Sequence, residues 1–237
     1  MKTLLAWLTL IVTTTFVVAP VLTPPFAGFR ADQLPNPQIA PPIQPAGYAF
    51  AIWGLIYTWL AVSAVFGVIR RRDDARWNRV RVPLIASLAL GTPWLAIANA
   101  SAIWATLTII AMAATAIAAL LATPAADRGW LRWPLALYAG WLTAASFVAL
   151  GATAAGYGIM TGPVGWAVVG IAGALCVAVA VLRRLPAAGY GGALVWALIG
   201  IVVANGMDNL AITTLALAGA AVVAVFTLWS GRQAHLA

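Results

Sequence analysis

The sequence predicts an all-α fold, a polytopic bundle of eight transmembrane helices. Of its 237 residues, 64% are hydrophobic, and the mean hydropathy is +0.98. Charged residues make up only 8% of the chain, against roughly 25% in ordinary soluble domains. The apolar residues fall into runs of about 20 residues, the length that spans a bilayer. These features exclude a soluble enzyme, a disordered protein and a nucleic-acid-binding protein.

The predicted spans follow the apolar runs in order. They cover residues 3–22, 47–69, 82–100, 102–122, 131–152, 164–182, 187–205 and 209–230. Charged or turn-forming residues mark the main breaks, namely Arg70 to Asp74, Thr123-Pro124, Gly156 to Pro163, Arg183 to Pro186 and Asn205 to Asp208.

The basic residues predict how the bundle is oriented in the membrane. With a cytoplasmic N-terminus, twelve of the thirteen lysines and arginines fall in cytoplasmic segments, and Arg30 alone falls outside. Both termini are then cytoplasmic, and the bias predicts a multi-pass protein of a cytoplasmic-type membrane, the bacterial inner membrane. The first run resembles a signal peptide, but Pro20 directly follows its one plausible cleavage site, which favours a retained helix. The basic segment 70–81 is expected to meet anionic lipid or a regulatory partner.

A proline-rich segment joins the first two spans on the outer side. Residues 31–46 contain five prolines, which are Pro35, Pro37, Pro41, Pro42 and Pro45. Prolines at this density favour stiff, extended backbone without ladder hydrogen bonds. The segment is either a plain surface connection or a lid over the outer end of the bundle.

Tryptophan is unusually frequent, with twelve residues. Rings at the membrane interface account for seven of them, namely Trp7, Trp77, Trp130, Trp133 and Trp229 on the inner side and Trp104 and Trp166 on the outer side. The others fall within hydrocarbon depth, and they are Trp53, Trp59, Trp94, Trp141 and Trp196. An indole N–H at that depth needs a partner from the protein, because lipid tails offer none.

Two aromatic stripes at helical spacing lie beneath the proline-rich segment. One face of the second span carries Phe50, Trp53 and Tyr57, and one face of the fifth carries Tyr138, Trp141 and Ala145. In the predicted orientation, four residues fall in the outer half, which are Phe50, Trp53, Trp94 and Ala145. Such stripes are either ordinary helix packing or the walls of a pocket for a flat apolar ligand.

Residues that carry catalysis or bind metals are scarce. The only cysteine, Cys176, lies inside an apolar run, and the only histidine, His235, lies near the C-terminal end. The predicted spans contain no carboxylate, and Asp208 is expected in a solvated turn. We therefore expect no metal site, no cofactor and no catalytic constellation. Single glycines are expected where helices pack closely, as at Gly170, Gly173, Gly200 and Gly219.

Three segments, in order, resemble the TspO family, also called translocator proteins or tryptophan-rich sensory proteins. Residues 45–57, PAGYAFAIWGLIY, are similar to the family's Pro-Pro-x-Trp-x-Phe and Val-Trp-x-x-Leu-Tyr pattern. Residues 88–94, LALGTPW, are similar to Leu-x-Leu-Asn-x-x-Trp, and residues 138–145, YAGWLTAA, to Tyr-x-x-Trp-x-x-x-Ala. Tyr48 stands where the family often has Trp, Gly91 replaces its Asn, and Phe147-Val148 replace its Leu-Asn pair.

The resemblance covers residues 1–155, where it implies the family's five-helix bundle, and residues 156–237 add three transmembrane helices. It implies an outer-side pocket for porphyrins, other tetrapyrroles or sterol-like ligands, closed by the loop between the first two helices. The matching pocket positions are Tyr48, Phe50, Trp53, Trp94, Trp141 and Ala145. Two residues that share these helix faces, Tyr57 and Tyr138, complete the ligand-binding candidates, and the lid candidates are Pro41, Pro42 and Pro45.

Three functional hypotheses follow. The first is an integral membrane sensor or carrier for a flat, porphyrin-like ligand, with membrane lipid as its other partner and a homodimer left open. The alternative is a secondary transporter, because residues 50–56 and 193–199 are weakly similar and lie on spans of opposite direction. A helix broken at Pro93, or Trp196 lining the same cavity as Trp53, would favour it. The third, implied by the resemblance, is light-dependent porphyrin breakdown involving a pocket tryptophan.

Overall fold

The computed structural model describes residues 2–236, and this part of the chain is helical and contains no strand. Its helices are α1 Lys2–Leu22, α2 Ile52–Arg70, α3 Ala75–Gly91, α4 Trp94–Ala100, α5 Ala102–Leu121, α6 Trp133–Gly156, α7 Pro163–Arg184, α8 Ala188–Asn205 and α9 Leu210–Leu236. Short turns lie between them, which are the 3-10 turns η1 Ala31–Gln33 and η2 Gly47–Ala51 and the π-helical turn η3 Arg128–Arg132.

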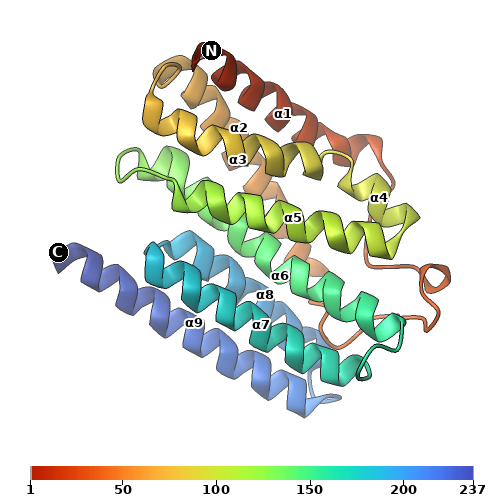
Figure 1. Cartoon of the computed structure of the whole chain (residues 1–237). Coiled ribbons are helices and arrows are strands. Elements are labelled where there is room, and N and C mark those ends of the chain that lie inside the picture. The colour runs from red at the N-terminus through yellow and green to blue at the C-terminus, as the bar shows by residue number, and fades with distance from the viewer. Residues whose placement is uncertain (1, 237) are drawn as a thin grey trace.

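Within residues 2–236, eight helical stretches are long and apolar enough to cross a membrane. The predicted all-α bundle of eight spans is therefore confirmed. Both termini lie at the same end of the bundle, as an even number of spans requires (Figure 1). This end also carries the arginine-rich connection after α2, and we call it the basic end. The opposite end, which carries the proline-rich segment, is the outer end.

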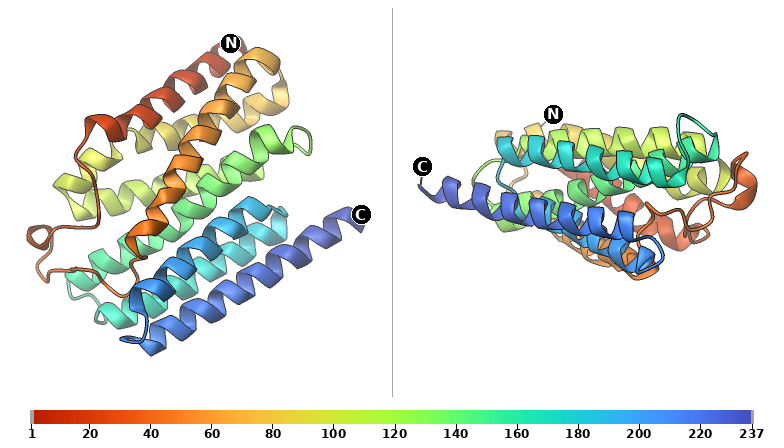
Figure 2. Two further views of the ribbon diagram at one scale, coloured as in Figure 1. Left: turned by 180° about the vertical axis from the view of Figure 1, so that it is seen from behind. Right: turned by 90° about the horizontal axis from the view of Figure 1, so that it is seen from below.

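Helix α6 lies in the middle of the bundle. It packs against α2, α5, α7 and α8, and 72% of its most apolar stretch is buried inside the protein. The helices α3, α5 and α7 lie on one side of the bundle, and α2 and α8 lie on the other (Figure 2). Helix α2 crosses that second side obliquely, from α8 at the outer end towards η3 at the basic end.

Small residues and paired hydroxyl groups fix α6 against its neighbours. A Cβ atom at Gly140 would collide with the backbone carbonyl of Tyr190 on α8, so only glycine allows this approach. The Tyr190 and Thr143 hydroxyl oxygens lie 2.9 Å apart, which satisfies both groups in the buried interface. These contacts lie in the half of α6 nearer the basic end and fix its orientation beside Trp141, which matters for the cavities described below.

The third span begins earlier than the apolar run predicts. Helix α3 starts at Ala75, because the Asp74 carboxylate accepts hydrogen bonds from the backbone N–H groups of Arg76 and Trp77 and caps the helix. The prediction of a start near residue 82 is therefore wrong. Trp77 is also not an interfacial ring, since only 3% of it is exposed.

The same span is interrupted near its outer end. Helix α3 ends at Gly91 and α4 begins at Trp94, with Pro93 as its first flanking residue. Proline has no backbone N–H to donate and its ring clashes with the preceding turn, so a continuous helix is unfavourable there. The break turns Trp94 towards the interior of the outer end, where it lines a cavity.

Candidate functional site

The outer loop, residues 23–46, is fastened to the helices after α5 rather than lying free on the surface. Asn36 donates hydrogen bonds from its backbone N–H and its Nδ2 to the Gly156 carbonyl, at 2.8 and 3.1 Å. Asn205 on α8 donates from Nδ2 to the Pro42 carbonyl at 2.8 Å. These bonds tie the proline-rich segment to the outer ends of α6 and α8.

Ile43 anchors the outer loop by inserting its side chain between helices. It is only 2% exposed, and it contacts the α7 backbone where Gly170 lacks a Cβ atom. A Cβ at Gly200 of α8 would lie 2.8 Å from Cβ of Pro45 and 3.0 Å from Cβ of Ala49. We expected Gly170 and Gly200 at contacts between helices. A Cβ at Gly170 would lie 3.3 Å from the Phe147 carbonyl of α6 as well as against Ile43, whereas the neighbours of Gly200 all belong to the segment that enters α2.

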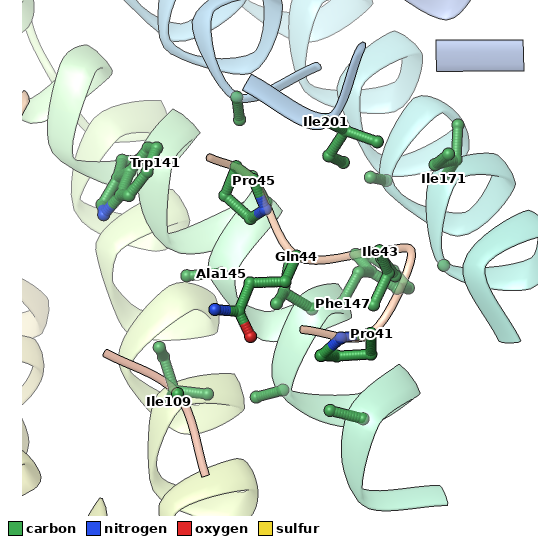
Figure 3. Close-up of a pocket in the computed structure, with 18 of the residues that line it drawn as sticks. Pro41, Ile43, Gln44, Pro45, Ile109, Trp141, Ala145, Phe147, Ile171 and Ile201 are labelled. Carbon is green, nitrogen blue, oxygen red and sulfur yellow. The ribbon is translucent and has the colours of Figure 1, made fainter. Parts of the chain in front are cut away.

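A first cavity, which we call the lid cavity, lies directly beneath the outer loop. Its volume is about 80 Å³, and it lies between the loop and α5, α6, α7 and α8. Figure 3 shows Pro41, Ile43, Gln44 and Pro45 of the loop over this space. The helices α7 and α8 form the opposite wall with apolar side chains, among them Ile171, Ala174, Leu198 and Ile201.

A second cavity, which we call the aromatic cavity, lies between α1, α2, the α3–α4 break, α5 and α6. Its volume is about 260 Å³. The rings of Trp53 and Tyr57 line it from α2, with their centroids 5.1 Å apart in a stacked arrangement. Phe16 of α1 meets both rings edge-on. The cavity therefore presents ring faces and edges that suit a flat apolar ligand.

A shared wall separates the two cavities. Phe50, Trp94, Trp141 and Ala145 line both of them, together with Phe26 and Ile109. Trp141 meets the rings of Phe50 and Trp53 nearly at right angles, with centroids 5.8 and 6.4 Å away.

The Trp141 indole is the polar group that stands out in this wall. Three other deep tryptophans have a backbone acceptor: Trp59 donates to the Gly129 carbonyl at 2.9 Å, Trp94 to the Ala105 carbonyl at 3.0 Å and Trp196 to the Ala49 carbonyl at 2.8 Å. The Nε1 of Trp141 is buried and has no hydrogen-bond partner among the described residues. It points away from Pro45 and Ile201 (Figure 3). A buried donor without a partner costs free energy, and a bound acceptor would remove that cost.

The structure brings six of the eight ligand-binding candidates together around the two cavities. They are Phe50, Trp53, Tyr57, Trp94, Trp141 and Ala145. Of the lid candidates, Pro41 and Pro45 line the lid cavity. Pro42 does not, but its carbonyl takes the hydrogen bond from Asn205 that holds the loop.

The two remaining candidates lie elsewhere. Tyr48 is 43% exposed and packs edge-on against Trp196, with ring centroids 5.5 Å apart. Tyr138 is fully buried, and its hydroxyl oxygen lies 2.9 Å from the hydroxyl oxygen of Ser87 on α3. Neither residue lines the lid cavity or the aromatic cavity, because Tyr48 points outward and Tyr138 is used in packing α6 against α3.

Several lining residues carry no signal in the sequence. Ile43 and Gln44 belong to a segment whose pattern predicts only extended backbone, and Ile171, Leu198 and Ile201 belong to continuous apolar runs. In the sequence, Gly170 and Gly200 alone indicate that another segment packs closely against α7 and α8. Their contact with the outer loop depends on how distant segments meet, which a single sequence does not display.

The site offers apolar burial, ring stacking and a hydrogen-bond donor. Among residues 3–232, whose side chains the structure describes, no group of three or more His, Cys, Asp or Glu could hold a metal ion. The polar side chains that line the cavities are Gln38, Gln44 and Tyr57, together with the indole groups. This set suits the binding of an apolar molecule better than acid–base chemistry.

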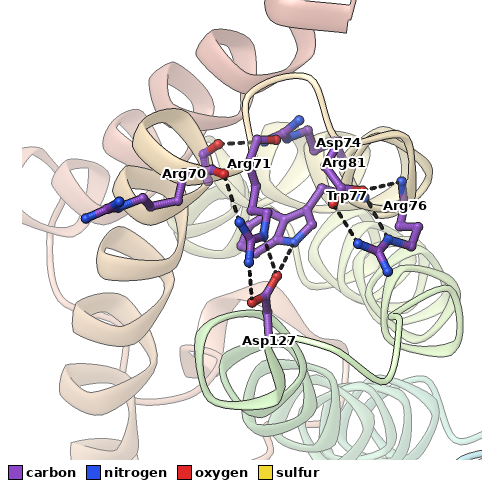
Figure 4. Close-up of polar contacts among 8 residues, drawn as sticks. Arg70, Arg71, Asp74, Arg76, Trp77, Arg81 and Asp127 are labelled. Carbon is purple, nitrogen blue, oxygen red and sulfur yellow. Dashed lines mark hydrogen bonds and ion pairs between the residues drawn. The ribbon is translucent and has the colours of Figure 1, made fainter.

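The basic end has a different character, shown in Figure 4. Arg71 forms a bidentate ion pair with Asp127, at 2.7 and 3.0 Å, and Trp77 donates its indole N–H to the same carboxylate at 3.0 Å. The hydrogen bond from Arg71 lowers the pKa of Asp127 below its usual range. These contacts join the connection after α2 to the connection after α5.

Arg81 stabilises the same end and is itself only 3% exposed. Its guanidinium donates to the backbone carbonyls of Gly67, Arg71 and Arg72, and so it caps the C-terminal end of α2. We expected the segment 70–81 to meet lipid or a partner. At least two of its arginines, Arg71 and Arg81, instead bind other groups of the protein.

Comparison with known proteins gives one finding for the whole chain. A family model described as TSPO-like protein matches residues 3–229. The match extends over α7, α8 and most of α9, beyond the 155 residues that carry the sequence resemblance. No curated protein and no solved structure matches the chain.

Proposed function

The chain belongs to the TSPO-like protein family, and from this membership we propose that it binds a flat hydrophobic ligand, such as a porphyrin, beneath its outer loop. It would act as a sensor or carrier for that ligand. The observation that carries the proposal is the convergence of six candidate residues on two adjoining cavities, with the unpartnered Trp141 N–H in the wall between them.

The size of the cavities bears on how such a ligand would fit. They measure about 260 and 80 Å³, whereas pockets for drug-sized ligands span roughly 300–1,000 Å³. A tetrapyrrole would need both spaces, with the Trp141 or Phe50 ring turned aside and the outer loop shifted. We therefore propose that the outer loop is a lid, and that the structure described here is its closed form.

The direct test is a titration of the purified protein in lipid nanodiscs with protoporphyrin, read by the absorbance shift of the porphyrin. Trp53→Phe and Trp141→Phe should each weaken binding by roughly two- to tenfold, because an aromatic contact contributes about 0.5–1.5 kcal/mol. Trp104→Phe is the matched control, since Trp104 is 65% exposed and lies away from both cavities. Equal behaviour of all three variants would contradict the proposed site.

A second candidate function, secondary transport, is favoured by one specific observation. The span 75–100 is interrupted at Thr92-Pro93, and the residues beside the break, Gly91 and Trp94, line the aromatic cavity. Discontinuous helices beside a binding site are common in transporters. Against this, Trp196 lines neither cavity, so the weak similarity between residues 50–56 and 193–199 gains no support. Saturable flux of a porphyrin across proteoliposomes would distinguish carriage from sensing.

The membrane in which the protein works is also a proposal. The chain is an integral, multi-pass membrane protein. Twelve of its thirteen basic residues lie at one end of the bundle, and such a bias is characteristic of insertion with that end in the cytoplasm. We propose a bacterial cytoplasmic membrane, with the outer loop on the opposite face.

A further inference from the structure

The charges of the outer end limit what the proposed site can bind. The outer end carries one base, Arg30, and two acids, Asp32 and Asp208, so its formal charge is −1. The remaining twelve bases and three acids lie at the basic end, across the thickness of the bundle. A ligand at the outer end therefore meets a weakly negative surface, although the chain as a whole carries +8.

Arg30 is already neutralised. Its guanidinium donates to both carboxylate oxygens of Asp32, at 3.0 and 3.1 Å, and to the Asn99 carbonyl at 2.6 Å. The hydrogen bond from Arg30 lowers the pKa of Asp32, so the carboxylate stays ionised beside it. The base nearest to the lid cavity, two residues after the lining Gly28, thus has its own counter-charge.

The cavity walls themselves carry no formal charge among the described residues. Gln38 and Gln44 of the outer loop are the polar side chains that line the lid cavity, and each donates one amide N–H to a backbone carbonyl, of Asn36 and Ala27 respectively. A carboxylate placed here would lose its hydration and gain no opposite charge, which is strongly unfavourable. An uncharged ligand does not meet this penalty.

The Trp53 N–H and the Tyr57 hydroxyl, which line the aromatic cavity, have no hydrogen-bond partner among the described residues, but only the Trp141 N–H is also fully buried. The Trp141 N–H is buried in the shared wall without an acceptor, and Trp141 is 2% exposed. A ligand that brings a carbonyl, ether or ring-nitrogen acceptor to this point would satisfy a group that the protein leaves unmet.

We infer that the site selects an uncharged flat ligand that presents a hydrogen-bond acceptor to the Trp141 indole, in preference to a dicarboxylate of the same ring system. The inference rests on the proposed function and names its ligand class. The outer loop enforces this selection by closing over the cavity, so that acidic groups on the ligand have no exit to water.

Protoporphyrin and its dimethyl ester provide the test, because they share one ring and differ in two carboxylates. Both are titrated into the full chain in phosphatidylcholine nanodiscs, with protein-free nanodiscs to subtract partition into lipid. The ester should bind about tenfold or more tightly than the acid. Asp32→Asn, which leaves Arg30 without its counter-charge, should tighten binding of the acid and leave that of the ester unchanged.

The hydrogen bond is tested separately with pyrene, a flat molecule without an acceptor. Trp141→Phe should weaken binding of the dimethyl ester about three- to tenfold more than it weakens binding of pyrene. Equal losses of affinity for the two ligands would show that a hydrogen-bond acceptor on the ligand does not contribute to binding.

The outcomes also separate this inference from the proposed function. If the acid binds as tightly as the ester, or Asp32→Asn has no effect on the acid, the selection for uncharged ligands is wrong, but the site stands. If neither porphyrin nor pyrene binds saturably, the proposed function fails and the inference with it.

Discussion

Tyr138 and Trp141 lie one turn apart on α6 and have opposite hydrogen-bonding states. The Tyr138 hydroxyl is paired with Ser87, which also donates to the Met112 carbonyl at 2.8 Å. Tyr138→Phe leaves Ser87 with that second partner and should lower the free energy of unfolding by about 1 kcal/mol. Porphyrin affinity should not change, because Tyr138 lines neither cavity. Unfolding in detergent and a binding titration measure the two effects. A large loss of porphyrin affinity would show that Tyr138 contributes to the ligand site.

Asp127 gives a prediction for pH at the basic end. Arg71 lowers the pKa of Asp127, so the folded state binds fewer protons at this group than the unfolded state. The stability that the pair contributes is complete above the ordinary carboxyl pKa of about 4 and is lost as pH falls through the lowered value.

Asp127→Asn keeps an acceptor for Trp77 and suits the left-handed backbone at φ 57°. Between about pH 5 and 3, thermal unfolding should show a steeper loss of stability for the native chain than for this variant. Asp74, which also has a lowered pKa, titrates in both proteins and cancels in the comparison. Parallel pH profiles would show that the Arg71–Asp127 pair contributes nothing.

At the scale of the elements, α8 provides a matched pair of glycines. Gly200 contacts Pro45 and Ala49, whereas a Cβ at Gly192 would meet open space. Alanine in place of glycine favours a helix by about 1 kcal/mol at either position, but at Gly200 it also overpacks the contact with the outer loop, at a cost of about 1–3 kcal/mol.

Gly200→Ala should therefore be less stable than Gly192→Ala and should release a bound porphyrin faster. Unfolding midpoints and dissociation rates of the two variants test this. Identical rates would mean that the contact between α8 and the outer loop does not control the lid.

The elements also show where reading the apolar runs succeeds. Runs of about 20 apolar residues predicted all eight spans. The start of the third span was predicted seven residues too late, because its charged residues were assigned to a loop. In the structure Asp74 caps the helix there, and Arg81 donates to a backbone carbonyl at the end of α2. Both effects depend on contacts between residues that the hydropathy of a window does not record.

At the scale of the whole molecule, helical spacing predicted several residues that line the aromatic cavity and missed the residues of the lid cavity on the outer loop, α7 and α8. Phe50, Trp53, Trp141 and Ala145 repeat at turns of two helices, so their shared faces could be read from the sequence. The other wall depends on where the outer loop meets α7 and α8, a long-range contact without a periodic signal. The predicted boundary at residue 155 stays a prediction. Helix α6, which ends at Gly156, packs against α2 and α5 from before this boundary and against α7 and α8 from after it.

Whether the outer loop closes the site is the central claim, and a reversible cross-link tests it most directly. A Cβ at position 170 would lie 3.6 Å from Cγ1 of Ile43, so cysteines at these two positions are near the geometry that a disulfide needs. The measurement uses Ile43→Cys with Gly170→Cys in a Cys176→Ser background, and compares protoporphyrin binding rates before and after reduction of the same sample. We predict that the oxidised protein takes up porphyrin at least about tenfold more slowly, because the lid cannot shift, and that reduction restores the rate. Equal rates in both states would contradict the claim that the ligand enters beneath this loop.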